Sequence, residues 1–161
     1  MRAKKIIITG GATRIGAAIA KSLVCYGVQI TLHYNKSGKE VKKLKKELES
    51  YGSEVFLIKA DLSIVSQTKK IIPFAHKMMK GLDCLVNNAS IFEKDDLINF
   101  NEKSFNKHMS INLQAPAILT QSFKKYLKSK KGNIINIIDQ RIFKLTPFFF
   151  RIHLVKLAFK H

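Results

Sequence analysis

The sequence has few cysteines, and their spacing indicates no special chemistry. Cys25 and Cys84 are the only two among 161 residues, and they lie far apart. Their positions match neither a metal-binding pattern nor a redox motif, so we expect no metal site. Such sparse use of cysteine fits a reduced, cytoplasmic setting best.

Long hydrophobic runs are also absent. No apolar window is long enough to cross a bilayer, so we expect no membrane partner. The apolar run behind the basic N-terminus is too short for a signal peptide, and glycines interrupt it at once. Low-complexity linkers are missing too. Residues 1–161 are therefore predicted to form a single domain, and a hydrophobic content of 46% is enough for a core.

Acidic residues are scarce. The chain has 11 Asp and Glu against 29 Lys and Arg, which gives a net charge of +18. Such a charge can attract nucleic acid. The lysines, however, recur at helical spacing in Lys36–Lys46 and around Lys124–Lys131, without interleaved aromatic residues or a nucleic-acid motif. This favours a solvated surface with no nucleic-acid partner, and a basic nucleic-acid binder is the less favoured alternative.

Strand and helix patterns alternate along the chain. Strands are predicted at Ile6–Thr9, Val28–His33, Glu54–Lys59, Leu82–Asn87 and Asn133–Ile138. Helices are predicted at Arg14–Tyr26, Lys36–Tyr51, Ile64–Lys80 and Glu102–Lys130, the last broken before Asn112 or by Pro116. Gly27, Gly52, Gly81 and Gly132 each fall where a helix should end. This order predicts an α/β fold, a doubly wound parallel sheet of the Rossmann type with helices on both faces.

A glycine-rich turn connects the first predicted strand to the first helix. It reads Thr9-Gly10-Gly11-Ala12-Thr13-Arg14-Ile15-Gly16. Glycines in such a turn let backbone N–H groups approach a phosphate, and the helix N-terminus adds partial positive charge at the same point. Because the turn lies between a strand and a helix, it predicts a nucleotide site.

The turn after the second strand indicates which nucleotide is bound. It reads His33-Tyr34-Asn35-Lys36-Ser37 and holds no acidic residue. NAD-specific folds usually place an acidic side chain here for the ribose 2′-hydroxyl. The donors and the positive charge of this turn suit a 2′-phosphate instead, so NADP(H) is the expected cofactor. The alternative is a polar turn without a ligand role.

These motifs together resemble the short-chain dehydrogenases/reductases, and within them the NADP-dependent, pteridine-reductase-like branch. The resemblance covers essentially the whole chain. Most of the family has glycine at the position of Arg14, whereas the pteridine-reductase-like branch also has arginine there. The resemblance implies that Arg14 reaches cofactor phosphate and substrate, and an ordinary solvated residue in the first helical turn is the alternative. Asp61-Leu62 matches the adenine contact, although Asp-Leu-Ser also fits a helix N-cap.

Two further parts of the resemblance follow the fourth strand. The run Asn87-Asn88-Ala89-Ser90 is similar to the family's Asn-Asn-Ala-Gly, which stabilises the central strand and lies beside the cofactor. Phe92 matches an aromatic residue that stacks on substrate, and a buried or lid-packing role is the alternative. The expected cofactor-binding residues are Gly10, Arg14, Ile15, Gly16, His33, Tyr34, Asn35, Lys36, Ser37, Asp61, Leu62, Asn87, Ala89 and Ser90.

The catalytic positions of the family are only partly matched. Asn112 matches the asparagine that holds a water and a helix irregularity, Asp139 closes the fifth strand where the family has Ser or Asp, and Lys156 matches the ribose-binding lysine. The tyrosine that donates the proton is replaced by Ile152, which can neither donate nor accept one. Losing a general acid typically lowers a rate by about 10²–10⁴-fold.

The resemblance therefore implies an NADPH-dependent oxidoreductase by descent, acting on a small carbonyl or pterin-like C=N substrate. We expect the chain to be truncated, with about five strands and the family's C-terminal strands missing, and to have little or no activity. The alternative is a non-catalytic NADP-binding or interaction protein. Family members assemble through their long helices, so a homo-oligomer through the helix that contains Asn112 is also possible.

Overall fold

A computed structural model describes residues 4–24, 28–93, 101–127 and 131–138. Its centre is a parallel sheet with the strand order β3-β2-β1-β4-β5. The strands are β1 (Lys5–Ile8), β2 (Gln29–Tyr34), β3 (Glu54–Lys59), β4 (Cys84–Asn87) and β5 (Asn133–Asn136). The order reverses between β1 and β4, which is where open sheets of this kind bind ligands at the carboxyl ends of the strands.

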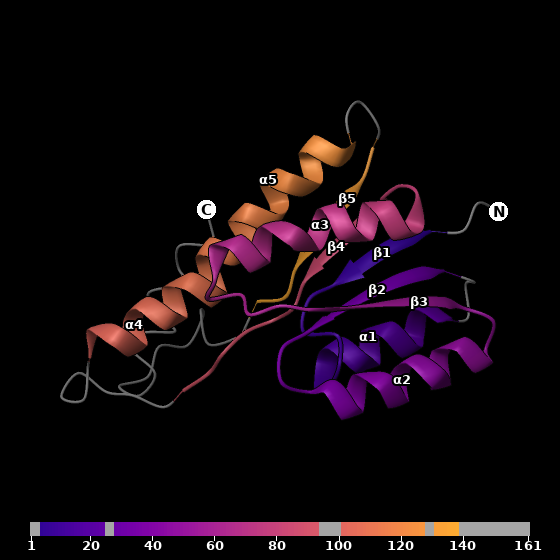
Figure 1. Ribbon diagram of the computed structural model, residues 1–161, viewed down its shortest axis with the longest axis horizontal. Helices are drawn as coiled ribbons and strands as arrows, with labels where there is room; N and C mark the ends of the chain where they lie inside the picture. Colours follow the sequence, from indigo (N-terminus) through magenta and orange to yellow (C-terminus); the bar gives the residue numbers. More distant parts are fainter. Residues whose placement is uncertain (1–3, 25–27, 94–100, 128–130, 139–161) are drawn as a thin grey trace.

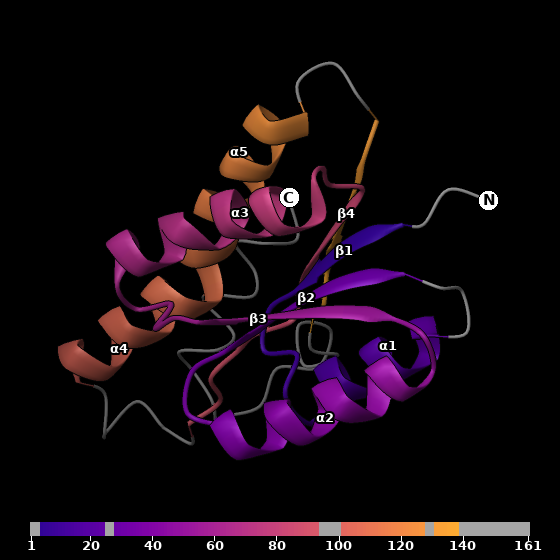
Figure 2. The same cartoon turned by 45° about the vertical axis from the view of Figure 1, so that its right-hand side comes forward.

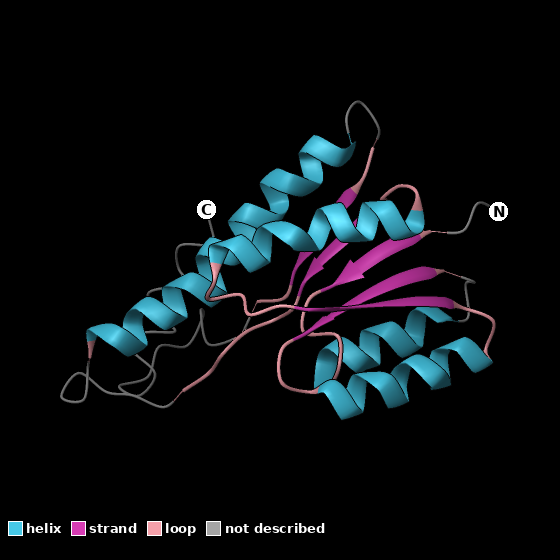
Figure 3. Ribbon diagram, viewed as in Figure 1, coloured by secondary structure: helices cyan, strands magenta, loops and turns pink. Residues whose placement is uncertain are grey.

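Helices cover both faces of the sheet (Figure 1; Figure 3). The helical segments are α1 (Arg14–Val24), α2 (Gly38–Ser50), α3 (Val65–Met79), α4 (Glu102–Met109), the π-helix η1 (Ser110–Gln114) and α5 (Ala115–Leu127). In Figure 1 and in the turned view of Figure 2, α1 and α2 lie on one side of the sheet, and α3 and α5 lie on the other. The predicted doubly wound α/β fold is confirmed.

Successive side chains of β1 pack against the helix layers on opposite faces of the sheet. Ile6 and Ile8 pack with α1 and α2, in a cluster that includes Ala20 and Leu44. Ile7 points to the other face and packs in the cluster that α3 and α5 complete. All three isoleucines are buried, as expected for a central parallel strand that is covered on both faces.

Most predicted element positions are right within two residues, and Glu54–Lys59 matches β3 throughout. Gly81 directly follows the capped end of α3, as expected, but the left-handed capping residue is Lys80, with a φ of 53°. The fifth strand ends at Asn136 rather than Ile138. Within the described part of the chain, no helix is both long enough and apolar enough to cross a membrane.

The predicted long helix is interrupted, as the sequence indicated. Its middle turn, Ser110–Gln114, is a π-helix, and α5 begins at Ala115 with Pro116 in its first turn. A π turn inserts one extra residue into the helix, and such turns are frequent at functional sites. Asn112 therefore lies in the irregular turn.

Candidate nucleotide-binding site

The glycine-rich turn joins β1 to α1 in a compact loop. Gly10 has a φ of 61°, a conformation that glycine adopts without steric cost. A Cβ on Gly16 would lie 2.2 Å from the Gly10 carbonyl oxygen, so only glycine allows α1 to start this close to the loop. Arg14 has a φ of 48° although it carries a side chain. The loop therefore holds a strained residue at the start of α1.

Asn88 and Thr9 fix this loop to the end of β4. The Asn88 side-chain Nδ2 donates to the carbonyl oxygens of Thr9 at 2.9 Å and Gly10 at 3.1 Å. In return, the Thr9 hydroxyl oxygen accepts from the backbone N–H groups of Asn88 and Ala89, both at 3.0 Å. Two segments that are distant in sequence are thereby held in one arrangement.

A cleft of ≈ 360 Å³ lies at the carboxyl ends of the strands. The loop, the start of α1, and the segments after β2, β3 and β4 all contribute to it. Expected site residues that line it are Gly10, Arg14, Ile15, Gly16, His33, Asn35, Asp61, Leu62, Ala89 and Ser90; Thr13, Asn88, Ile91 and Ile111 line it as well. The structure thus brings four separate motifs to one cleft.

His33 lines the cleft, but its ring nitrogens bond to the backbone. Nδ1 accepts from the Gly10 N–H at 3.2 Å, and Nε2 lies 3.0 Å from the Ala60 carbonyl oxygen. Burial lowers the pKa of His33, an effect that the Ala60 carbonyl and the charge of Asp61 partly oppose. The ring is therefore neutral near pH 7.

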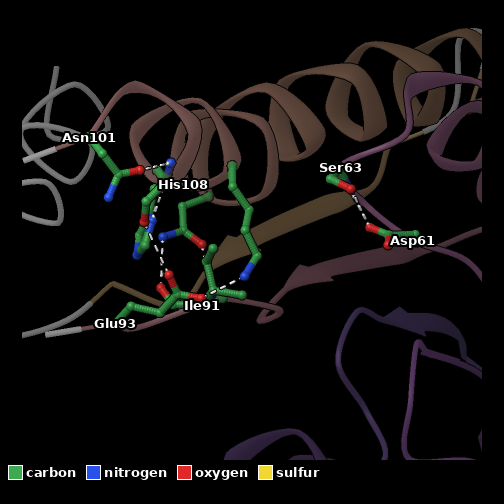
Figure 4. A network of polar contacts seen from close by, with 10 residues as sticks. Asp61, Ser63, Ile91, Glu93, Asn101 and His108 are labelled. Atoms are coloured by element: carbon green, nitrogen blue, oxygen red, sulfur yellow. Dashed lines mark hydrogen bonds and ion pairs between the residues drawn. The ribbon is translucent and has the colours of Figure 1, made fainter.

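Asp61, which also lines the cleft, is held by its own turn. Its Oδ1 accepts from the Ser63 N–H at 2.9 Å and the Ser63 hydroxyl at 2.6 Å (Figure 4). These two bonds lower the pKa of Asp61, and the Asn35 side chain and the Lys36 charge act in the same direction. The N-cap interpretation of this motif is wrong, because Ile64 caps α3 without a side-chain bond. Asp61 forms an Asx turn instead.

Several expected site residues lie away from the cleft lining. Tyr34 ends β2 and packs against the α1–α2 layer, while Lys36 is exposed and Ser37 precedes α2. Asn87 is buried and donates to the Asn136 side chain at 2.9 Å. The Phe92 side chain is 46% exposed. Asp139, Ile152 and Lys156 lie outside the described residues.

Asn112 clamps the segment after β4. Its Oδ1 accepts from the Ile91 N–H and its Nδ2 donates to the Ile91 carbonyl, both at 2.9 Å. Glu93 is held beside it, accepting from Lys107 at 2.6 Å and from the Ser104 hydroxyl at 3.1 Å (Figure 4). The Lys107 ammonium is the main reason that the pKa of Glu93 is lowered. Helix α4 and η1 thereby fix the wall of the cleft that Ile91 forms.

The sequence analysis does not assign Asn88 or Ile91 to the site. Asn88 belongs to the Asn87–Ser90 motif, and its position directly after a strand that ends beside the glycine-rich turn was the available signal. Ile91 carried no such signal, because its contribution is a backbone contact with Asn112 and a place in the cleft wall. Within the described ranges, no group of three His, Cys, Asp or Glu side chains could hold a metal ion.

A parallel sheet covered on both faces, with a glycine-rich loop at the switch in strand order, defines a nucleotide-binding α/β domain. The family comparison makes the assignment narrower. The short chain dehydrogenase model matches residues 4–144, and the chain belongs to this family.

Relatives and solved structures agree with this assignment. An uncharacterized oxidoreductase of Methylorubrum extorquens is 28% identical over 137 residues, covering 85% of this chain and 55% of that protein. The alternative dihydrofolate reductase FolM of Brucella canis, crystallised with NADP, has a TM-score of 0.89 and 32% identity, covering 95% of this chain and 62% of that one. A Burkholderia cenocepacia short chain dehydrogenase with NADP has a TM-score of 0.91 and 25% identity, with 97% and 64% covered. The chain thus spans between half and two thirds of their length.

Proposed function

We propose that this chain is the NADP(H)-binding part of a short-chain oxidoreductase. The observation that carries the proposal is the cleft into which the start of α1 and the ends of β1, β2, β3 and β4 all project residues. The solved structures of FolM and of the Burkholderia dehydrogenase, both crystallised with NADP, support it.

The residues at the start of α1 suit a pyrophosphate. The first N–H groups of a helix have no partner within the helix, and they carry partial positive charge. Thr13, Arg14 and Gly16 line the cleft here, and Arg14 adds a full charge. Ile15, whose side chain is 59% exposed, offers an apolar surface to the adenosine part of the cofactor.

The turn after β2 suits a 2′-phosphate. Asn35 lines the cleft, and the exposed Lys36 follows it and adds a positive charge. The turn His33–Ser37 itself carries no acidic side chain that could accept from a ribose 2′-hydroxyl. This favours NADP(H) over NAD(H).

We propose that the reaction of the lineage is hydride transfer to a carbonyl or pterin-like C=N bond. Bound NADPH would supply the hydride, while Asn112, Asp139 and Lys156 occupy the family's catalytic positions. The name of FolM, an alternative dihydrofolate reductase, supports the pterin-like choice. Ile152 in the tyrosine position leaves no proton donor there, so we propose cofactor binding with little or no turnover.

The cofactor proposal is tested by titration at pH 7.5, with NADPH and NADH monitored by nucleotide fluorescence. We expect NADPH to bind about tenfold or more tightly, because one charge-assisted bond to phosphate contributes about 1.5–3 kcal/mol. Lys36→Ala should remove most of this preference by weakening NADPH and sparing NADH. Lys42→Ala, on the exposed side of α2, is the matched control. Equal affinities of the unchanged chain for the two nucleotides would contradict the proposal.

The turnover proposal needs a separate assay. NADPH oxidation is followed with dihydrofolate or an aromatic aldehyde as acceptor, at saturating cofactor. Saturable binding with little or no turnover is the result we expect. Slow residual turnover would favour an impaired oxidoreductase, and complete loss of turnover would favour the second candidate function, a non-catalytic NADP-binding protein. Sustained oxidation that depends on the acceptor would show that the missing tyrosine is dispensable. We also propose a cytoplasmic location and a homo-oligomer formed through α4, η1 and α5.

A further inference from the structure

His33 holds the glycine-rich loop through two kinds of contact. Its ring Nδ1 accepts from the Gly10 N–H at 3.2 Å, and its backbone carbonyl accepts from the Gly11 N–H at 3.0 Å. On the opposite edge of the ring, Nε2 meets the Ala60 carbonyl oxygen at 3.0 Å. The side chain is only 2% exposed, so water does not compete well for these contacts.

These partners determine the protonation state of the ring. A backbone N–H can only donate, so Nδ1 must carry a lone pair, and a carbonyl can only accept, so Nε2 must carry the proton. Only the neutral Nε2–H tautomer satisfies both contacts. A second proton on Nδ1 would place two donors against each other at Gly10.

We propose that His33 is a positioning residue for the nucleotide site, which sets the glycine-rich loop relative to the Ala60–Asp61 turn, and that protonation of its ring releases the loop and weakens cofactor binding. This inference rests on the proposed NADP(H) site. It assigns no direct contact between the ring nitrogens and the cofactor.

The surroundings of the His33 ring have opposing effects on its protonation. Asp61, after β3, favours the charged ring, whereas burial outweighs it and lowers the pKa of His33. On the other neighbouring elements, Arg14 opens α1, Lys59 ends β3 and Lys36 lies in the turn after β2. Cofactor affinity should therefore not change with His33 ionisation at pH values above the ordinary histidine pKa of about 6.5. It should fall at lower pH, where the ring becomes protonated.

Two substitutions separate the two ring contacts. His33→Asn places an amide oxygen near the position of Nδ1 and can keep the Gly10 bond, whereas His33→Gln places an amide nitrogen near Nε2 and can keep only the Ala60 bond. Neither side chain titrates. Calorimetric titration with NADP⁺ is carried out from pH 7.5 to 5.5 on the whole chain and on both variants.

At pH 7.5, we expect His33→Gln to weaken NADP⁺ binding by about tenfold and His33→Asn by less than about threefold, in line with one lost hydrogen bond at the loop. The cofactor 2′-phosphate, with a pKa of about 6, titrates in every sample. The informative quantity is therefore the affinity of the unchanged chain divided by that of His33→Asn. This ratio should fall on acidification to pH 5.5, by less than about tenfold because burial lowers the His33 pKa below its usual value of about 6.5. A constant ratio would overturn the proposal.

A cofactor-free readout separates failure of this inference from failure of the proposed function. In the NMR spectrum of the unliganded chain, the Gly10 amide resonance should titrate with the same midpoint as the His33 ring, and it should not do so in His33→Asn. Absence of NADP⁺ binding at pH 7.5 would reject the proposed function alone. A Gly10 resonance that ignores the His33 titration would reject the positioning role, whatever the cofactor does.

Discussion

Arg14 combines an unfavourable backbone conformation with a charge that suits a phosphate ligand. Its φ of 48° lies in the left-handed region, where a residue with a Cβ is strained by about 1–2 kcal/mol. Its charge also lies at a helix N-terminus, which is unfavourable for a cation. A bound anion would compensate the unfavourable position of the Arg14 charge. The proposed pyrophosphate site is the cleft that Arg14 lines.

Replacing Arg14 by glycine should therefore separate stability from binding. We expect Arg14→Gly to raise the free energy of unfolding by up to about 1 kcal/mol, since strain is relieved while the unfolded chain gains some entropy. NADPH affinity should fall by about tenfold. The measurements are urea unfolding and fluorescence titration.

Two control variants make the Arg14 test specific. Arg14→Ala removes the same charge but keeps the strained backbone, so it should lose affinity without the gain in stability. Lys80→Gly relieves a similar strain, at a φ of 53°, outside the cleft lining, so it should gain stability and leave affinity unchanged. A gain in affinity for Arg14→Gly would contradict the phosphate role.

At the scale of elements, η1 couples the long helical segment to the cleft wall. Asn112 lies in the π turn, and its amide pairs with both backbone groups of Ile91, a residue that lines the cleft. The Glu93–Lys107 pair nearby is exposed, and pairs of this kind contribute little. The buried amide of Asn112 is therefore the main link between these elements.

Asn112→Ala should destabilise the chain by about 2–4 kcal/mol, because two backbone groups of Ile91 lose their partners. Cofactor affinity should fall by about threefold as the Ile91 wall loosens. Asn106→Ala, which removes an exposed amide on α4 with only a 3.5 Å contact to Glu102, is the control and should change stability by less than about 0.5 kcal/mol. Thermal and urea unfolding measure both effects. Equal stabilities for the two variants would show that the clamp is unimportant.

At the scale of the whole molecule, two surfaces could bring chains together. One is a groove on the outer face of α4, η1 and α5, where Met109, Leu113 and Ala117 contribute lining side chains. The other is β5, the outer strand of the described sheet, where Ile134 and Ile135 are 40% and 47% exposed. Outer strands with apolar side chains promote irregular aggregation, whereas a helical face supports a closed dimer.

A charge on each surface should therefore have a different effect. Leu113→Arg should convert the proposed homo-oligomer into monomers, because a buried unpaired charge is costly at an interface. Ile135→Lys should leave the oligomer intact and reduce slow aggregation. Sedimentation velocity and light scattering distinguish the two results. An unchanged sedimentation coefficient for Leu113→Arg would contradict assembly through the helices.

The sequence by itself determined the order of the elements and the positions of the candidate cofactor-binding motifs along the chain. Alternating apolar periodicities fix strands and helices locally, and β-branched runs such as Ile6–Ile8 can only be buried in a covered sheet. The glycine-rich turn and the turn at Asn35–Ser37 follow strands, and the carboxyl ends of parallel strands meet at one edge. The location of the cleft, at the carboxyl ends of the strands, was therefore predictable from the sequence.

Only the tertiary structure decided how the cleft is held together. Asn88 bonds to Thr9 from 79 positions away, and His33 joins Gly10 to Ala60 across two strands. No local pattern records such contacts, because they depend on strand order and on which edge of a side chain faces its neighbour. The sequence motif predicts that His33 binds the cofactor. In the structure, both of its ring nitrogens contact backbone groups of Gly10 and Ala60.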